Sequence, residues 1–476
     1  MLGRDAGWIA TRLMPPVLVA VAGLGFAPSA FGGTTFEVDS TRDGIDADPT
    51  DGVCATARGK CTLRAAIGQA NETAGNPTIK IARGTYKLKR PPAATESNEE
   101  GDLQIDVQMT IDGAGRRRTV IAQTRRDRVL ANNGGAAPFS PVTIRDVTIT
   151  GGREGGPGTS VGGGGILNLG ALLLDRTVVR GNSARGPDSA GGGVYSSGLL
   201  LVDRSVVRDN RVRSLDSIAT GGGINAANGT LAITRSRVLA NRAIAAKPVD
   251  GRAGGVGVGD NATISDTTIA GNSSTGGPGG LGVNDELDLR TSTISGNSAR
   301  QGGGLFSSGL ATIENTTISG NTATQGKGSA IYRFTTTESM TLRHVTVAKN
   351  HASDAHAAIE AEPDVPDESI VLTGSIVHNP GLDCGPSVGE FLTDRSVFGD
   401  TTCSPDGVVT NAFGNPLLRD LADNGGRTRT HALRPQSPAI GHVAAGCPPP
   451  ASDQRNVVRP QGSACDAGAY ERVPGS

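Results

Sequence analysis

Residues 191–210, GGGVYSSGLLLVDRSVVRDN, return in altered form at 302–321 as GGGLFSSGLATIENTTISGN. Each copy starts with three glycines, continues through two short runs of strand-forming residues and ends in Asn. This Asn occurs eight times along the chain, at spacings of 24 to 31 residues. The eight residues are Asn182, Asn210, Asn241, Asn272, Asn297, Asn321, Asn350 and Asn379. A short repeat built from strands is typical of a β-solenoid.

The residues before each Asn alternate in character, which identifies the buried face. The third residue before it is Val or Ile in all eight repeats, and the fifth is mostly Thr or Ser. Because strand side chains alternate between two faces, these positions point inward, and the fourth and sixth point outward. The pattern predicts an all-β fold, a parallel β-helix whose coils stack about 4.8 Å apart. A leucine-rich repeat would show helical outer segments, and a propeller would need about 40 residues per blade.

The composition fits a narrow interior and excludes several classes of protein. Of the 476 residues 70 are Gly and only 3% are aromatic, while 45 Lys and Arg balance 46 Asp and Glu. Collagen would need Gly at every third position, and a disordered chain would need a larger net charge. There is no basic excess to indicate a nucleic-acid partner. We expect small aliphatic and hydroxyl residues to fill the interior and Gly to allow the chain to turn between strands. We expect the Asn column to form a structural ladder.

The N-terminus is typical of a secretion signal. Residues 1–33 contain a weakly basic start, the apolar run MPPVLVAVAGLGF at 14–26 and an A-x-A-like sequence at 30–32. The run is shorter than the roughly 20 residues of a membrane span, and no later segment is apolar enough to cross. We expect an exported protein, extracellular or on the outer cell surface, monomeric and without a transmembrane span in its mature form.

The cysteines agree with export. They are Cys54, Cys61, Cys384, Cys403, Cys447 and Cys465. Six cysteines allow fifteen full pairings, of which pairing between sequence neighbours is the simplest. Zinc-binding spacings such as CxxC are missing from the sequence, so disulfides in an oxidising compartment are the expected chemistry.

The ends of a coil stack need covers, because unpaired strand edges recruit other strands. We assign residues 34–75 to an N-terminal cap, in which 61–72 is a short amphipathic helix with Thr62 as N-cap. Its apolar stripe consists of Leu63, Ala66, Ile67 and Ala70.

The β-helix and a C-terminal cap follow. The repeats are assigned to 76–415. The segment 416–476 is rich in Pro, Cys and Asp and shows little periodicity. We expect it to close the C-terminal end of the stack, held together by Cys447 and Cys465.

Motifs at both ends resemble known families. Residues 61–67, CTLRAAI, resemble the CSLREA-type motif of exported bacterial proteins, with Thr62 for Ser and Ala65 for Glu. The tail resembles the choice-of-anchor Q domain through DNGG, THAL, SPAI, DQR, RP and CDAGAYE, which start at 423, 430, 437, 453, 459 and 465. The middle is similar to right-handed, pectin-lyase-like β-helices and to polymorphic outer-membrane-protein repeats. The resemblance implies an exported or surface-associated protein of mostly uncharacterised activity.

An outward column of charged residues is the candidate functional site. It stands six residues before the recurring Asn and includes three stacked arginines that could grip a polyuronate or another polyanion. Neighbouring aspartates could act as catalytic acids, or they could pair with the arginines on a solvated face. The candidates are Arg176, Arg204, Arg235, Asp175, Asp203 and Asp266.

Two further groups invite a functional interpretation. Asp46, Asp48 and Asp51 resemble a loose calcium loop, which makes Ca²⁺ the candidate cofactor, although their spacing differs from a DxDxDG box. A polar turn before the first disulfide is the alternative. In the tail motifs we expect His431 and Arg455 to form capping hydrogen bonds.

Two functions follow from these observations. The first is a secreted or surface-associated β-helix protein, non-catalytic, in adhesion or extracellular interaction with a glycan or a cell-surface component. The alternative is a polysaccharide lyase, glycoside hydrolase or epimerase acting on polyuronate or related glycans. Because the single Trp, Trp8, lies in the predicted signal, the mature chain offers few aromatic platforms for sugars, which favours the first function.

Overall fold

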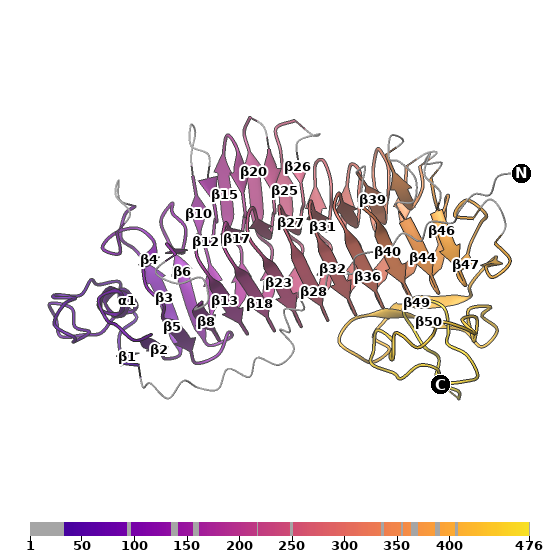
Figure 1. The fold of residues 1–476 in the computed structure, drawn as a ribbon. Helices are drawn as coiled ribbons and strands as arrows, with labels where there is room; N and C mark the ends of the chain where they lie inside the picture. The colour runs from indigo at the N-terminus through magenta and orange to yellow at the C-terminus, as the bar shows by residue number, and fades with distance from the viewer. Residues whose placement is uncertain are drawn as a thin grey trace, which may run out of the picture.

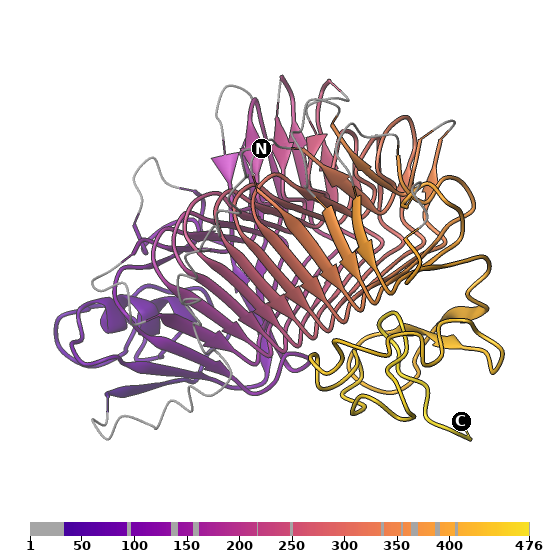
Figure 2. The same cartoon turned by 45° about the vertical axis from the view of Figure 1, so that its right-hand side comes forward.

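The computed structural model is an elongated right-handed parallel β-helix, which confirms the predicted fold class (Figures 1 and 2). The described residues are 33–92, 97–134, 141–155, 161–216, 218–247, 251–334, 338–353, 356–362, 370–385, 391–404 and 408–475. The predicted secretion signal falls outside them, apart from Gly33. Within these ranges, no helix has the length and apolar character needed to cross a membrane.

A single coil shows how the chain turns. Its first three strands are β17 (Val194–Ser196), β18 (Leu200–Asp203) and β19 (Val206–Arg208). The next two, β20 (Arg211–Ser214) and β21 (Ala219–Thr220), form an arm that projects from one side (Figure 1). Each strand pairs in parallel with its counterpart in the next coil, so that residues of the same kind stack along the axis.

Within the β-helix, the described strands form three long sheets and two arm sheets, all parallel. Sheet I runs from β1 (Thr35–Val38) to β46 (Phe391–Asp394), and sheet II from β3 (Gly84–Leu88) to β48 (Ala412–Phe413). Sheet III runs from β4 (Leu103–Ile105) to β43 (Ile359–Ala361). The arm sheets run from β10 (Arg153–Glu154) to β42 (His351–Ala352) and from β11 (Val161–Gly162) to β26 (Gly251–Arg252). Because β1 pairs with β2 (Thr78–Ile81), the stack begins earlier than residue 76.

The interior is a continuous column of aliphatic side chains, as the alternation predicts. In the coil described above, Val194, Leu200, Val202 and Val207 are at most 1% exposed. Burying one such side chain stabilises the fold by about 1.5–3 kcal/mol, and every coil buries several of them.

The glycine triplets let adjacent coils approach closely. Gly191 has a φ of 63°, a left-handed conformation that favours glycine. At Gly192 a Cβ atom would lie 2.5 Å from the carbonyl oxygen of Gly222 in the next coil, and at Gly193 it would lie 2.6 Å from that of Gly223. The predicted need for a positive φ therefore explains the first glycine, and close packing between coils explains the other two.

The eight Asn side chains form a hydrogen-bonded ladder. From Asn182 to Asn379, each side-chain amide donates to the side-chain oxygen of the next Asn at 2.9–3.1 Å. At the end of the ladder Asp383 takes the place of a further Asn, and its Oδ1 accepts from Asn379 Nδ2 at 3.1 Å. Buried polar groups are costly without partners, so the ladder has a structural role in every coil that it crosses.

Helix α1 (Leu63–Asn71) covers the N-terminal end of the stack, as predicted. Thr62 is its N-cap, and the Thr62 hydroxyl accepts the backbone N–H of Ala65 at 3.1 Å. The predicted apolar stripe of the helix joins the main core.

The same helix buries Arg64, which is 1% exposed. Its Nε lies 2.6 Å from Asp43 Oδ1. The guanidinium also donates to the backbone carbonyls of Asn98, Gly101 and Asp102 at 3.0, 2.7 and 3.0 Å. Arg64 therefore joins the segment before α1 to the loop before β4.

The C-terminal segment lies along the side of the β-helix (Figures 1 and 2). It contains an antiparallel pair, β49 (Leu418–Ala422) and β50 (Thr430–Leu433). Its apolar residues pack against Ile376 and Val397 of sheet II. The expectation that this segment closes the end of the stack therefore needs correction. It covers the outer face of the last coils, where outward Thr and Ser side chains offer hydrogen-bonding partners.

Ile376 is the third residue before Asn379, so the repeat predicts that it points inward. It pairs instead with the outward Thr346, and Val377 takes the inward place beside Val347, because this last repeat reaches its Asn one residue sooner.

Three disulfides join sequence neighbours. Cys54–Cys61 precedes α1, Cys384–Cys403 connects loops at the last coils, and Cys447–Cys465 lies within the C-terminal segment. These are the pairs that the simplest connectivity predicts, and none of the described cysteines is free.

Candidate functional site

The predicted charged column lies at the corner between sheets I and II. Arg176, Arg204 and Arg235 each have a φ of 48°, so the chain turns there in a left-handed conformation that non-glycine residues seldom adopt. Asp175 and Asp203 end the sheet I strands that directly precede this turn. Stacking of the coils brings the corner side chains into one exposed column.

Acidic and basic side chains alternate along this column in a continuous ion-pair ladder. Every carboxylate in it lies within 3.0 Å of at least one guanidinium. The pairs are Asp146–Arg176 at 2.7 Å, Arg176–Asp175 at 2.5 Å, Asp175–Arg204 at 2.9 Å, Arg204–Asp203 at 3.0 Å and Asp203–Arg235 at 2.7 Å. The three arginine side chains are 37–47% exposed, so each pair contributes little to stability on its own.

Asp266, the sixth candidate, belongs to a different part of the column. Its Oδ1 accepts from the Thr291 hydroxyl at 2.9 Å, and Arg427 of the C-terminal segment lies 3.7 Å from its Oδ2. The following corner residues, Asn315 and His344, are buried because the C-terminal segment covers them. The structure thus brings five of the six candidates into one ladder and separates Asp266 from them.

The calcium candidates do not converge on a common point. Asp46 Oδ1 accepts the N–H of Asp48, Asp48 Oδ1 accepts that of Thr50, and Asp51 Oδ1 accepts that of Val53, at 3.2, 3.0 and 2.7 Å. In the described part of the chain, no group of three or more His, Cys, Asp or Glu side chains is arranged to hold a metal ion. These carboxylates satisfy their own backbone, as the polar-turn alternative predicts.

A cavity of about 250 Å³ lies where the first arm strand meets the loop that Arg64 holds. Its lining includes Asp102, Asp127, Arg128 and Glu154, and Arg128 lies 3.3 Å from Glu154 and 3.6 Å from Asp102. Burial raises the pKa of Asp127 to about 6, and the charge of Glu154 adds to the rise. The charge of Arg128 offsets those of Asp102 and Glu154 in the cavity wall. No sequence motif indicates this cavity.

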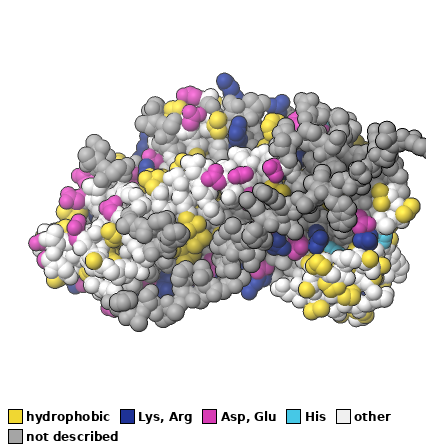
Figure 3. Space-filling model, viewed as in Figure 1, with side chains coloured by type: hydrophobic (Ala, Val, Ile, Leu, Met, Phe, Trp, Pro, Cys, Tyr) yellow, Lys and Arg dark blue, Asp and Glu magenta, His cyan; other side chains and the backbone are white. Residues whose placement is uncertain are grey.

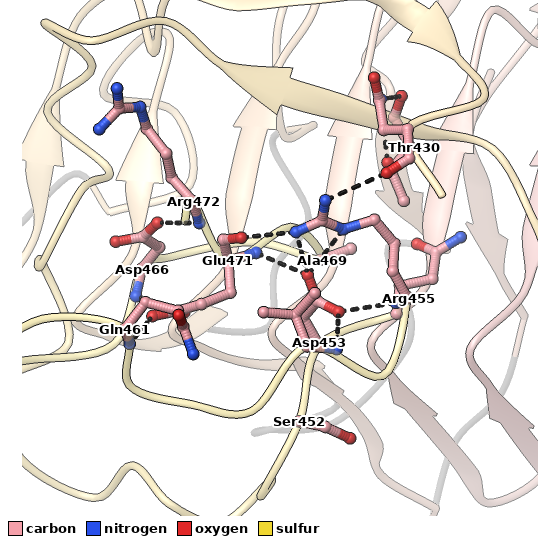
Figure 4. A network of polar contacts seen from close by, with 12 residues as sticks. Thr430, Ser452, Asp453, Arg455, Gln461, Asp466, Ala469, Glu471 and Arg472 are labelled. Atoms are coloured by element: carbon pink, nitrogen blue, oxygen red, sulfur yellow. Dashed lines mark hydrogen bonds and ion pairs between the residues drawn. The ribbon is translucent and has the colours of Figure 1, made fainter. Parts of the chain in front are cut away.

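The tail motifs form a buried polar network (Figure 4). Asp453 Oδ2 lies 2.8 Å from the Arg455 guanidinium and accepts the N–H of Glu471 at 2.9 Å. The Glu471 carboxylate lies 2.6 Å from Arg459 and accepts the N–H of Asp466 at 2.9 Å. Arg455 also donates to the Glu471 carbonyl at 2.5 Å, which is the kind of contact that the predicted capping role requires.

Two histidines lie buried where the C-terminal segment meets the β-helix. On the face drawn in Figure 3, basic and acidic side chains gather along the boundary between that segment and the coils. His431 Nε2 lies 2.8 Å from Ser319 Oγ, and His344 Nδ1 lies 3.2 Å from the Asp466 carbonyl. Burial lowers the pKa of His344 to about 3 and also lowers that of His431.

Acidification is expected to weaken this interface. The unfolded chain takes up a proton at His344 below pH about 6.5, whereas the folded chain does so only near pH 3, so stability is lost as the pH falls between these values. Asp466, whose pKa burial raises to about 6, acts in the opposite direction between pH 4 and 6. A His344→Asn variant isolates the histidine, because Asn315 occupies the same corner one coil earlier.

In urea denaturation at pH 7 and pH 5, the wild type should lose roughly 2 kcal/mol more than His344→Asn between the two values. Parallel pH profiles for the two proteins would contradict the assignment.

A second group of outward arginines was not predicted from the sequence. It lies on the outer face of sheet II and of the arm, on β14 (Val178–Arg180), β15 (Ser183–Gly186), β19, β20 and β25 (Arg242–Ile244). We call it the arginine face; its members are Arg180, Arg185, Arg208, Arg211, Arg213 and Arg242. These positions stand two residues before, or one and three residues after, the recurring Asn, and that spacing is the signal that could have revealed them.

Comparison with solved structures finds two that resemble this chain. The A-module of the Azotobacter vinelandii mannuronan C-5 epimerase AlgE6 aligns with a TM-score of 0.41 and 17% identity, over 78% of this chain and 98% of that one. Pectate lyase Pel9A aligns with a TM-score of 0.38 and 14% identity, over 93% and 98%. No protein-family profile and no curated protein sequence matches the chain. With TM-scores and identities this low, no conclusion about the activity of this chain follows from the two structures.

Proposed function

We propose that this chain is an exported, non-catalytic β-helix protein that binds a partner outside the cell or at its surface. The observation that carries the proposal is the closed ion-pair ladder at the corner of sheets I and II. Asp175 lies between Arg176 and Arg204, and Asp203 lies between Arg204 and Arg235. An acid, base or charged group acts in catalysis only if it can reach the reacting atoms, and here each group already has partners.

Export is part of the same proposal. The signal-like segment at 1–33 supports it, and so do the three disulfides, since such bonds persist mainly in oxidising compartments. We further propose that the mature protein acts as a monomer.

Membership of the CSLREA and choice-of-anchor Q families is a further part of the proposal. Arg64, in the first motif, is buried and holds the N-terminal cap together. Asp453, Arg459 and Glu471, in the second, are at most 2% exposed and hydrogen-bonded to one another or to the same loop. In both motifs the polar residues therefore serve the architecture of the end segments. We also propose a division into a signal at 1–33, an N-terminal cap at 34–75 that contributes the first strand of the stack, repeats at 76–415, and a C-terminal segment at 416–476 that covers the side of the last coils.

A polysaccharide-processing enzyme remains the second candidate. The favouring observation is that arginine and aspartate side chains from adjacent coils lie within 3.0 Å of one another on an exposed column, with Arg204 47% exposed. A polyuronate that displaced the ion pairs could reach both kinds of group.

One assay separates the two functions. The mature protein is incubated with a panel of polyuronates, with and without Ca²⁺, and the polymers are then examined for shortening, unsaturated ends and changed epimer content. We expect no change relative to buffer alone. A change that the wild type produces and that Arg204→Ala does not would establish the enzyme and overturn the proposed function.

A further inference from the structure

The arginine face concentrates positive charge in a chain whose net charge is only −1. Register places Arg211 beside Arg242 in the next coil, and Arg213 beside Arg185 in the previous one. Among the described residues, Arg208 alone of the six has an ion pair, with the neighbouring Asp209. Within the structure's described ranges, no carboxylate therefore lies at ion-pair distance from the other five side chains.

The arginines of this face repel one another, and Arg211 at the centre shows the effect most clearly. Burial lowers the pKa of Arg211, and the charges of Arg242, Arg213 and Arg185 lower it further. By contrast, Asp146 raises the pKa of Arg176, in the ion-pair ladder. A row of like charges is unfavourable for the isolated protein, so a bound anion would relieve it.

The later coils of sheet II are covered by the chain itself. On β37 (Thr317–Ser319) and β41 (Thr346–Ala348), the outward residues are buried under the C-terminal segment. Thr317 donates to Gln454 at 2.7 Å, and Thr346 accepts from the N–H of Ala469 at 2.9 Å. Small hydroxyl residues thus occupy these covered coils, whereas the arginine face lies on coils that the C-terminal segment does not cover.

We propose that the arginine face binds a linear acidic polysaccharide, such as a polyuronate or a sulfated glycan, across the coils of β15, β20 and β25. Guanidinium groups bind carboxylate and sulfate through paired hydrogen bonds. Their rows repeat about every 4.8 Å from coil to coil, which suits a polymer with one charge per sugar. Double-stranded DNA carries a charge about every 1.7 Å along its axis, a much denser array. The inference deepens the proposed function and rests on it, because it names the partner.

Binding to immobilised polygalacturonate tests the inference, with fully methyl-esterified polygalacturonate as the uncharged ligand. The wild type should bind the acid form at about 50 mM salt and lose about tenfold in affinity at about 200 mM salt. It should not bind the methyl ester at either salt concentration. The double variant Arg211→Ser/Arg242→Ser should bind at least about tenfold more weakly. Serine is the native residue at the same register in the flanking coils, at Ser183 and Ser273, so the variant should fold.

The matched control is Arg145→Ser/Arg290→Ser, which removes two arginines that form ion pairs elsewhere on the molecule. Its affinity should stay within about twofold of the wild type. The inference is overturned by equal losses in both variants, by binding to the ester, by no binding at low salt, or by tighter binding to DNA or anionic vesicles. Polymer cleavage is measured in the same samples. Cleavage refutes the non-catalytic function. If the wild type neither binds nor cleaves the polymer, only the inference about the arginine face is refuted.

Discussion

Replacing Arg64 by Ala is expected to destabilise the N-terminal cap by about 3–5 kcal/mol. The substitution leaves Asp43 without its buried partner and removes the guanidinium that donates to the carbonyls of Gly101 and Asp102. Removing one member of a buried pair is costly because the remaining charge stays out of water. Chemical denaturation followed by circular dichroism gives the free energy of unfolding, and proteolysis at the 98–102 loop reports on the cap itself.

Arg58→Ala is the matched control, since Arg58 is exposed and precedes the same helix. Its effect should stay within about 0.5 kcal/mol. The double replacement Arg64→Met/Asp43→Leu should recover only part of the loss, because the guanidinium that donates to the backbone carbonyls is still missing. If Arg64→Ala unfolds at the same denaturant concentration as the wild type, the cap does not depend on this contact.

Replacing Arg459 by Ala is expected to weaken attachment of the C-terminal segment by about 3–5 kcal/mol. Arg459 is 2% exposed, and its loss leaves the buried Glu471 carboxylate uncompensated. It also donates to the carbonyls of Asp466 and Gly468 at 2.9 and 2.7 Å and reaches Asn315 of the β-helix at 3.4 Å. Thermal unfolding should show the segment melting before the coils, and limited proteolysis should remove residues after about 416 first.

Arg434→Ala provides the comparison, because Arg434 belongs to the same segment and its side chain is exposed. Its thermal profile should match the wild type within the error of the measurement. If Arg459→Ala instead melts in a single transition together with the coils, the segment and the β-helix are one cooperative unit.

The features that the sequence predicted well depend on contacts between residues that are close in sequence or equivalent in successive repeats. The inward positions of Val179 and its counterparts, the Asn ladder and the α1 stripe all follow from periodicity, because each residue stacks on its own equivalent. The cysteine pairs are close in sequence, so they too could be inferred. The spacing of the calcium candidates was a weaker guide, because it does not reveal that each carboxylate accepts from its own turn.

The charged column shows why the site was harder to predict. Arg176 and Arg211 are both outward arginines of the repeat, yet the first lies between two aspartates and the second lies among arginines. The difference depends on whether the adjacent coil offers an acid at the same register. Position six before the Asn also proved to be a left-handed corner and not a strand face, which directs the side chain along the column.

The sequence by itself determined the β-helix, its narrow interior and its helical N-terminal cap, because these rest on contacts between equivalent residues one repeat apart. Only the tertiary structure decided which outward face is covered and which arginines have ion pairs. His344 and Thr317 are buried by residues more than 100 positions later, Asp466 and Gln454. No local pattern encodes a contact of that range, since it depends on where the C-terminal segment folds back along the finished stack.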